Sequence, residues 1–455
     1  MTTSTSTPDF VLRGGTVVQP KVGTRIADVA VASGKITAVT APGEAPSSDW
    51  EIEATGLHVF PGVVDPHVHI GLGNGLSEYE TDSGAAILGG VTTAFYILIE
   101  AGPYQKAVPE HLEAATASHV DFAYHATLMT PAHVAELEVL SETYGIRSFK
   151  YYMSFRGDEG AYMGVEGTDD GVFYEILKSV SSVGGVLAVH PENIEIVWKL
   201  REELMRKARD DLNAWNDSRP PFVEAEALRR ASFLGTKTNC DLYFVHVSSA
   251  EAVDGLLDSR SAFGRERLHA ETCPHYLTHT SNDPIGPLGK VNPPLRTEAD
   301  QHRLWDSLLD GTIDTIGSDH VGRRRSAKQG SIWDASAGFP GMSTILPVLI
   351  TEGYHRRGLS LERIAELTAF NPSKIFGVGH LKGDIRPGLD ADLAVVDLTL
   401  ERKADPSSLG TYSDYSLYQE RDLAGWPRYT FVRGQLAQEN GVLARDPGGG
   451  IYIRR

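Results

Sequence analysis

The chain has 455 residues and a formal net charge of −18, so it is long enough for a large domain plus a second module. The acidic balance disfavours nucleic-acid binding, because phosphate contacts need clustered Lys and Arg. No apolar run reaches the ~18 residues that span a bilayer, which predicts a protein without a membrane partner.

Two further observations bear on the compartment. Cys240 and Cys273 are the only cysteines, too few for a disulfide framework. The segment 1–8 is polar and lacks the apolar core of a signal peptide. We therefore expect a cytoplasmic protein.

The elements near the N-terminus are short and β-rich. Phe10–Val18 and Ala27–Val39 alternate apolar and polar residues and contain the turn pairs Gly14-Gly15 and Gly34-Lys35. This pattern is typical of β-hairpins.

After about residue 56 the pattern changes to short apolar runs that alternate with amphipathic stretches. The eight predicted strands are Val59–His67, Thr92–Leu98, Val120–Thr127, Arg147–Tyr152, Gly185–His190, Asp241–His246, Leu268–Thr272 and Asp314–Gly317. The predicted helices between them include Glu110–Ala117, Val172–Ser182, Ile194–Asn213 and Ala225–Leu234. Strand–helix alternation repeated eight times predicts an α/β fold, a (β/α)8 TIM barrel over residues 57–376.

A further helix, Leu359–Thr368, precedes a return to short strands. These are Ala391–Val396, Tyr429–Arg433 and Val442–Arg445. We expect them to pair with the N-terminal hairpins, so that residues 1–56 and 377–455 together form a β-sandwich domain.

Side chains that bind metals occur where predicted strands end, which is the catalytic edge of a β/α barrel. His67 and His69 are two residues apart, and in an extended segment they point to the same side. Lys150 ends the apolar run 146–149, where burial would lower its pKa and allow reaction with CO2 to a carbamate. Hydrogen-bonded strand-end histidines and a lysine that extends to the rim are the alternatives.

His190 and His246 each end an apolar strand, and Asp319 follows the last one. Separately, they are explained equally well as core histidines and as a helix N-cap. Together with the preceding residues they predict a binuclear centre. In that centre His67, His69 and Asp319 hold one ion, His190 and His246 hold the other, and carbamylated Lys150 bridges them. Nitrogen and oxygen ligands suit Zn2+, with Co2+, Mn2+ or Fe2+ as alternatives.

These residues lie in segments that resemble the amidohydrolase superfamily, in particular its hydantoinase, dihydropyrimidinase, allantoinase and dihydroorotase branch. The matching segments are 61–69, 148–150, 189–193, 245–248, 271–277, 292–296, 317–320, 338–341, 371–374 and 388–393. The resemblance implies a barrel flanked by a β-sandwich, a carboxylated lysine, and a homodimer or homotetramer.

The resemblance also places residues around the substrate. It implies that Asn292, Gly338, Ser318, Tyr152 and Phe155 bind the substrate. It further implies that His275 and His320, with Ser318, orient the ligands, although ordinary loop hydrogen bonding explains these three equally well.

Two positions depart from the relatives. Dihydroorotases carry an Arg two residues after the His pair, where this chain has Gly71, so dihydroorotase is disfavoured. D-Hydantoinases and dihydropyrimidinases carry an oxyanion-stabilising Tyr where this chain has Phe155, and a phenyl ring cannot donate a hydrogen bond. Tyr152 or Ser154 would have to replace that donor, or the substrate differs; L-selective or atypical hydantoinases fit at least as well.

Two groups of side chains have less specific interpretations. Five aromatic residues either line a hydrophobic pocket or belong to the ordinary core: Tyr151, Tyr152, Phe155, Tyr162 and Trp333. The basic run 323–325 is either a solvated loop or the border of a pocket.

The sequence therefore predicts a hydrolase that opens a cyclic amide C–N bond of hydantoin, dihydropyrimidine, imide or ureide type. The attacking group would be a metal-bridging hydroxide, with Asp319 as general base and acid. The alternatives are the same chemistry on a linear or xenobiotic amide or carbamate, and a non-catalytic dihydropyrimidinase-related scaffold protein. The retained ligand set disfavours the scaffold.

Overall fold

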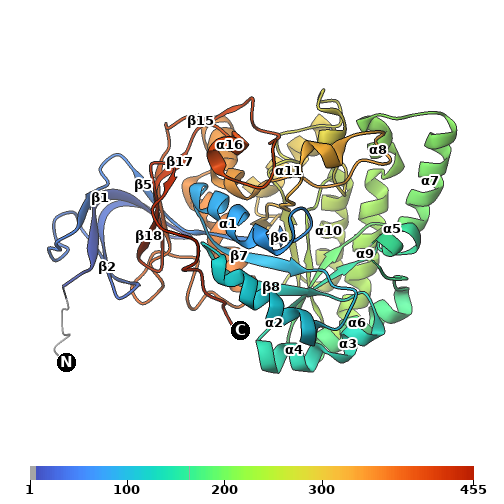
Figure 1. The fold of residues 1–455 in the computed structure, drawn as a ribbon, viewed down its shortest axis with the longest axis horizontal. Coiled ribbons are helices and arrows are strands. Elements are labelled where there is room, and N and C mark those ends of the chain that lie inside the picture. The colour runs from blue at the N-terminus through green and yellow to red at the C-terminus, as the bar shows by residue number, and fades with distance from the viewer. Residues whose placement is uncertain (1–6, 163) are drawn as a thin grey trace.

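The computed structural model describes residues 7–162 and 164–455, and in these ranges the chain forms a barrel next to a mixed sheet (Figure 1). Eight parallel strands build the barrel in the order β13-β12-β11-β10-β9-β8-β7-β6. They are β6 (Val63–His69), β7 (Val91–Leu98), β8 (Asp121–Thr127), β9 (Ser148–Tyr152), β10 (Val186–His190), β11 (Asp241–Phe244), β12 (Leu268–Thr272) and β13 (Thr315–Ile316). The predicted parallel barrel is confirmed.

The barrel closes where its first and last strands meet. The backbone N–H of His69 donates to the carbonyl of His320 at 2.9 Å, and Val68 pairs with His320 in a parallel bridge. The segment after β13 therefore lies directly against the end of β6.

Helices surround the barrel strands. They are α1 (Glu78–Leu88), α2 (Tyr104–Ala114), α3 (Pro131–Ala135), α4 (Leu137–Tyr144), α5 (Gly157–Tyr162), α6 (Asp170–Ser182), α7 (Ile194–Arg206), α8 (Leu212–Ser218), α9 (Pro221–Thr238), α10 (Ala250–Phe263), α11 (Glu298–Leu309), α12 (Ile345–Val348), α13 (His355–Arg357), α14 (Leu361–Ala365), α15 (Asn371–Ile375) and α16 (Pro406–Leu409). Among the described residues, no helix is both long and apolar enough to cross a lipid bilayer.

The second sheet has nine strands and draws on both ends of the chain, which appear as blue and red strands side by side in Figure 1. Its strands are β1 (Phe10–Gln19), β2 (Gly23–Ala32), β3 (Lys35–Thr40), β4 (Glu51–Glu53), β5 (His58–Pro61), β14 (Leu393–Asp397), β17 (Trp426–Val432), β18 (Gln435–Glu439) and β19 (Val442–Leu443). A separate two-stranded ladder joins β15 (Arg402–Lys403) to β16 (Asp422–Leu423). The domain boundaries near residues 56 and 376 stay a prediction.

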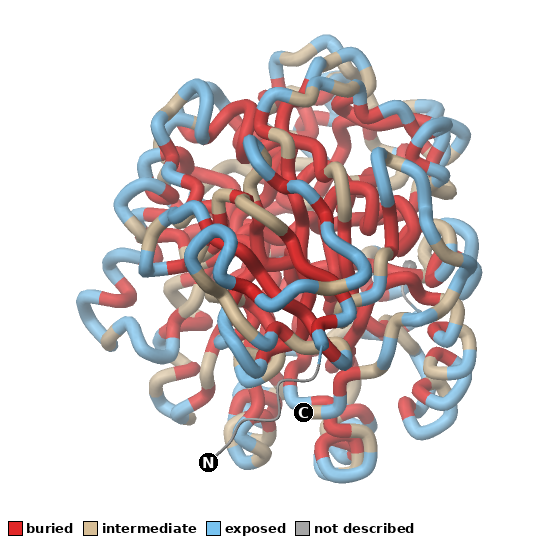
Figure 2. Tube along the Cα trace, turned by 90° about the vertical axis from the view of Figure 1, so that its left-hand side faces the viewer, coloured by how far each residue is buried: buried red, intermediate tan, exposed pale blue. Residues whose placement is uncertain are grey.

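Buried residues concentrate in the middle of the molecule (Figure 2). One buried cluster combines barrel-strand side chains with a segment after the last barrel helix and one residue near the C-terminus. Its members are Val64, Phe95, Ala123, Ala188, Tyr243, Val245, Phe376, Val378 and Ile453. The barrel therefore has a packed core rather than a channel.

Two predicted elements are divided in the structure. The run Val59–His67 becomes β5 in the mixed sheet and β6 in the barrel, with Gly62 between them. A Cβ at Gly62 would lie 2.2 Å from Oγ1 of Thr92, so only glycine permits this crossing. The predicted helix Ile194–Asn213 becomes α7 and α8, because Ala208 is left-handed (φ 52°) and Asp211 caps a new helix.

Candidate active site

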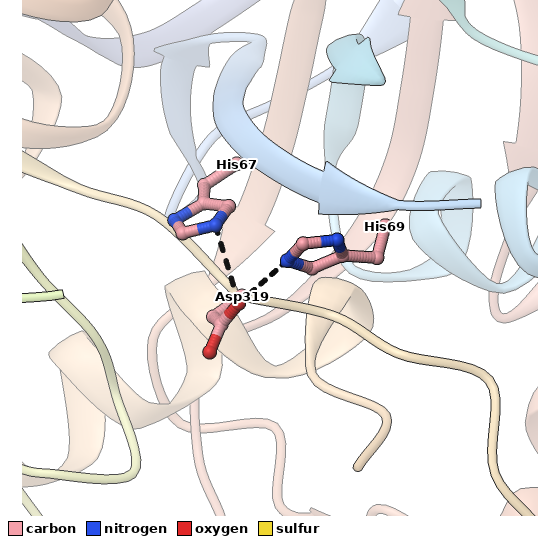
Figure 3. A group of neighbouring side chains, drawn as sticks. All are labelled: His67, His69 and Asp319. Carbon is pink, nitrogen blue, oxygen red and sulfur yellow. Dashed lines mark ion pairs between the residues drawn. The ribbon is translucent and has the colours of Figure 1, made fainter. Parts of the chain in front are cut away.

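Three predicted ligands converge at the mouth of the barrel (Figure 3). His67 and His69 lie at the end of β6, and Asp319 follows β13. Nε2 of each histidine lies 3.2 Å from Oδ1 of Asp319. All three side chains are buried, and one ligand atom from each falls within 4.8 Å of the others. These atoms could all contact a single ion.

The backbone at two predicted ligands is left-handed, which is uncommon outside glycine. His246 has φ 42° and Asp319 has φ 49°. Such conformations cost of order 1–3 kcal/mol and cluster at functional sites.

Lys150 lies on β9 and is fully buried. Its Nζ lies 3.3 Å from Nε2 of His67 and 4.9 Å from the ring centroid of Tyr152. Burial lowers its pKa to about 8. Among the described residues no carboxylate oxygen lies within 4.0 Å of the amine, so the structure offers it no ion-pair partner.

His190 and His246 lie beside this group with their rings nearly perpendicular, 4.5 Å apart between centroids. Nε2 of His190 faces Glu192 at 2.6 Å, and Nδ1 of His246 is buried with no hydrogen-bond partner among the described residues. Neither joins the three-residue group around Asp319. The six predicted ligands therefore lie near one another in the structure. Three of them, His67, His69 and Asp319, form the compact group.

A buried carboxylate that the sequence interpretation missed, Glu271, lies beneath this group. Its Oε1 lies 2.8 Å from Nδ1 of His67 and accepts from the backbone N–H of His246 at 3.0 Å. Its Oε2 accepts from the Tyr243 hydroxyl at 2.7 Å. Burial raises the pKa of Glu271 to about 8. A Cβ at Gly317 would lie 2.3 Å from its Oε2, which explains the glycine.

Two further residues that the sequence interpretation missed, Glu192 and Arg219, hold His190 in place. Glu192 Oε2 lies 2.6 Å from His190 and accepts from Arg219 Nη1 at 2.8 Å. Burial alone would raise the pKa of Glu192, but Arg219 and His190 lower it to about 2. The spacing His190-Pro191-Glu192 in the sequence was the available signal for this contact.

The predicted orienting residues lie close to the ligands. Ser318 Oγ donates to the carbonyl of His67 at 3.2 Å and accepts from the backbone N–H of His320 at 3.1 Å. The ring of His320 lies 3.4 Å from Asp82 and accepts from the backbone N–H of Gly341. His275 is buried, and its Nε2 has no hydrogen-bond partner among the described residues. Burial lowers the pKa of His275 to about 4.

A cavity of ≈ 340 Å3 opens onto the converging ligands. The predicted site residues that line it are His69, His190, His246, Asp319, Tyr152, Phe155, Asn292 and Gly338. Ser318, His275 and His320 are buried and do not line it. The rings of Tyr152 and Phe155 stack at 4.0 Å between centroids, and the Tyr152 hydroxyl is buried without a hydrogen-bond partner among the described residues.

The other aromatic residues divide between cavity and core. Trp333 lines the cavity, whereas Tyr151 stacks on Phe173 at 4.5 Å. The side chain of Tyr162 lies outside the described residues. Of the basic run 323–325, Arg323 lines the cavity, and Arg324 lies over the ring of Tyr412.

The residues present fit a divalent metal. Burial lowers the pKa of His67 and His69, so both rings are held in the neutral form that binds metals. Two imidazole nitrogens and a carboxylate oxygen facing one point suit Zn2+ and related ions. Burial raises the pKa of Cys273 well above its ordinary value, so no thiolate competes with these ligands.

Known proteins resemble the chain over almost its full length. The model of the amidohydrolase family matches residues 266–437. An L-hydantoinase of Paenarthrobacter aurescens is 34% identical over 440 residues, covering 94% of each chain. An allantoinase of Solibacter usitatus is 36% identical over 454 residues, covering 97% of this chain and 96% of its own length.

Solved structures agree with these relatives. The L-hydantoinase (dihydropyrimidinase) structure from Arthrobacter aurescens superposes with a TM-score of 0.92 at 33% identity, covering 98% of this chain and 100% of its own. A crystal structure of D-hydantoinase gives a TM-score of 0.89 at 28% identity and covers 98% of each chain. The chain therefore belongs to the amidohydrolase family, as its sequence motifs predict.

Proposed function

We propose that this protein is a metal-dependent hydrolase that opens the C–N bond of a cyclic amide. The observation that carries the proposal is the convergence of His67, His69 and Asp319, of which His69 and Asp319 line a cavity. The full-length similarity to proteins named L-hydantoinase and allantoinase supports the cyclic amide class.

The metal centre we propose is binuclear. His67, His69 and Asp319 would hold one ion, His190 and His246 the other, and Lys150, carboxylated by CO2, would join them. The buried amine without a carboxylate partner supports the modification, because its pKa of about 8 leaves part of the population unprotonated near neutral pH. We propose Zn2+, with Co2+, Mn2+ or Fe2+ as alternatives. When bound, such ions supply Lewis acidity and lower the pKa of water.

The chain's own residues would handle protons and substrate. Asp319 lines the cavity, where its carboxylate can accept a proton and pass it to the departing nitrogen. Asn292 lines the cavity, and its Oδ1 has no hydrogen-bond partner among the described residues. It is therefore free to contact the substrate amide.

The hydrogen-bond donor that Phe155 cannot provide has a candidate in Tyr152. Its hydroxyl lies in the cavity wall, is buried and has no partner among the described residues. Ser154 is buried and does not line the cavity. We therefore propose Tyr152 as the donor to the developing oxyanion.

The test is hydrolysis of hydantoins, dihydrouracil, allantoin, dihydroorotate, cyclic imides and linear carbamates, with Zn2+, Co2+ or Mn2+ and bicarbonate present. We expect turnover of at least one cyclic amide. If the protein hydrolysed linear carbamates and none of the cyclic compounds, its substrate class would be linear carbamates rather than cyclic amides. A metal-loaded protein inactive on every compound would contradict the hydrolase proposal and favour a scaffold role.

We also propose that the chain forms a homodimer or homotetramer. Large apolar side chains are exposed on neighbouring helices α9 and α10, which contact each other closely. They are Phe222, Phe233, Leu257 and Phe263, each 39–48% exposed. Light scattering at micromolar concentration would contradict this proposal if it gave the mass of a single chain.

A further inference from the structure

A buried lysine lines the cavity. Lys290 is 4% exposed, and its Nζ lies 4.1 Å from the ring centroid of Trp215. The ammonium donates one hydrogen bond, to the carbonyl of Trp333 at 3.1 Å. An ammonium has three N–H donors, so part of its hydrogen-bonding capacity is unused.

The charge of Lys290 is also unbalanced. The guanidinium of Arg219 forms an ion pair with Glu192 at 2.8 Å, and that of Arg201 forms one with Glu159 at 2.7 Å. Among the described residues, by contrast, no carboxylate oxygen comes within 4.0 Å of Lys290 Nζ. A buried charge without a counter-ion is costly. An anion entering the cavity would supply that counter-ion.

Few other hydrogen-bond donors near Lys290 are available to a ligand. Trp215 Nε1 donates to the carbonyl of Val291 at 2.9 Å, and Trp333 Nε1 donates to that of Arg209 at 2.9 Å. Both indole N–H groups therefore already have an acceptor, and neither is available to a ligand in the cavity. Arg219 Nε is buried and has no hydrogen-bond partner among the described residues, so it adds a second unused donor beside Lys290.

The acidic groups near Lys290 do not cancel this preference. Glu159 is held by Arg201 and by Trp198 Nε1 at 2.7 Å. Asp334 lines the cavity but is exposed to solvent, where its charge is screened. The buried part of this wall therefore carries a net positive charge while Lys290 is protonated.

We propose that Lys290, with Arg219 beside it, receives an anionic substituent of the substrate, so that the enzyme favours cyclic amides whose ring carries a carboxylate side chain. This inference rests on the proposed cyclic amide hydrolase function. Gly71 does not line the cavity and has no side chain to bind such a group, whereas Lys290 lines the cavity and carries a cation.

The test compares two hydantoins that differ only in charge. One carries a 2-carboxyethyl group at ring carbon 5, and the other carries the isosteric 2-carbamoylethyl group. We expect the wild type to favour the acid, and Lys290→Met to lower the acid-to-amide ratio of kcat/KM by about tenfold through KM, because a charge-assisted contact is lost. Lys290→Arg should keep part of the preference.

The control is Lys199→Met on α7, whose lysine side chain is 76% exposed; it should leave the ratio unchanged. The ratio should also fall as pH rises through about 7. Burial and then Arg219 lower the pKa of Lys290 to about 7, and only the protonated amine attracts an anion. The KM of the neutral amide should not follow this pH dependence.

A binding measurement separates failure of this inference from failure of the proposed function. Quenching of tryptophan fluorescence should report the binding of both hydantoins, because Trp215 and Trp333 line the cavity. Equal affinity of the acid for wild type and Lys290→Met would overturn the inference, whether or not turnover occurs. Binding of the acid without turnover of either hydantoin would count against the proposed function alone.

Discussion

Asp319 combines three uncommon features in one residue. It faces His67 and His69 at 3.2 Å, lines the cavity and adopts a left-handed backbone conformation. A residue that served only as a helix cap would need none of these properties. Its geometry supports the combined role of ligand and proton acceptor that we propose.

Asp319→Asn separates these two roles. The amide oxygen can still act as a ligand, but the side chain can no longer accept a proton. We expect kcat to fall by about 10²–10⁴-fold, with most of the metal retained. The measurement is kcat together with metal content, and thermal unfolding checks the fold. A rate near that of the wild type would contradict the role as base.

The residues that we propose as ligands could be selected from the sequence because they follow local rules. His67 and His69 share a side by strand spacing, and His190 ends a predicted strand. Lys290 and Trp215 could not be predicted in this way. They meet only because α8 and a loop after β12 fold over the barrel mouth, and no local pattern encodes that contact.

At the scale of elements, the loop after β6 depends on the first residue of α1. The carboxylate of Glu78 accepts from the backbone N–H groups of Gly71 and Gly73 at 2.7 Å each, and from that of Asn74. Glu78 is fully buried. One side chain thus satisfies three backbone donors of the loop that follows His69.

Glu78→Gln should loosen this loop. One carboxylate oxygen becomes an NH2 group that cannot accept, so at least one half-buried backbone N–H loses its partner, at a cost of at most about 1–3 kcal/mol. Glu80→Gln on the exposed side of the same helix is the matched control and should change the free energy of unfolding little. Equal effects of the two variants in urea denaturation would show that the contacts of Glu78 do not hold the loop.

The strands were predicted closely because buried parallel strands are short, continuous apolar runs. Leu268–Thr272 agrees with β12 at both ends, and Thr92–Leu98 differs from β7 by one residue. The divisions at Gly62 and Ala208 were missed because they depend on contacts distant in sequence and on a left-handed residue without glycine. Apolar periodicity contains neither kind of information.

At the scale of the whole molecule, a buried lysine joins the barrel to the mixed sheet. Lys382 Nζ lies 2.5 Å from Asp121 at the start of β8, 2.9 Å from Asp390 and 2.5 Å from Asp392, just before β14. The three carboxylates lie close enough together to suggest a metal site. Lys382 already supplies the cation, so we interpret the group as a structural link.

Lys382→Met should destabilise the protein strongly. Asp121 would keep its contact with Arg433 and Asp390 its contact with Lys35, but buried Asp392 would lose its ion-pair partner. Breaking a buried ion pair from one side costs about 3–5 kcal/mol. The matched control is Lys35→Met, because Lys35 also pairs with Asp390 at 2.6 Å but is 41% exposed. That pair should contribute no more than about 1 kcal/mol. A similar loss of unfolding free energy in both variants would contradict this assignment.

The central claim is that buried side chains at the barrel mouth hold a pair of catalytic cations. The most direct test is elemental analysis of active protein, compared with Lys150→Ala prepared in the same way. We predict two divalent ions per chain in the wild type. The variant should lose them together with activity, with partial rescue by short carboxylic acids. Active protein free of divalent ions would contradict the claim.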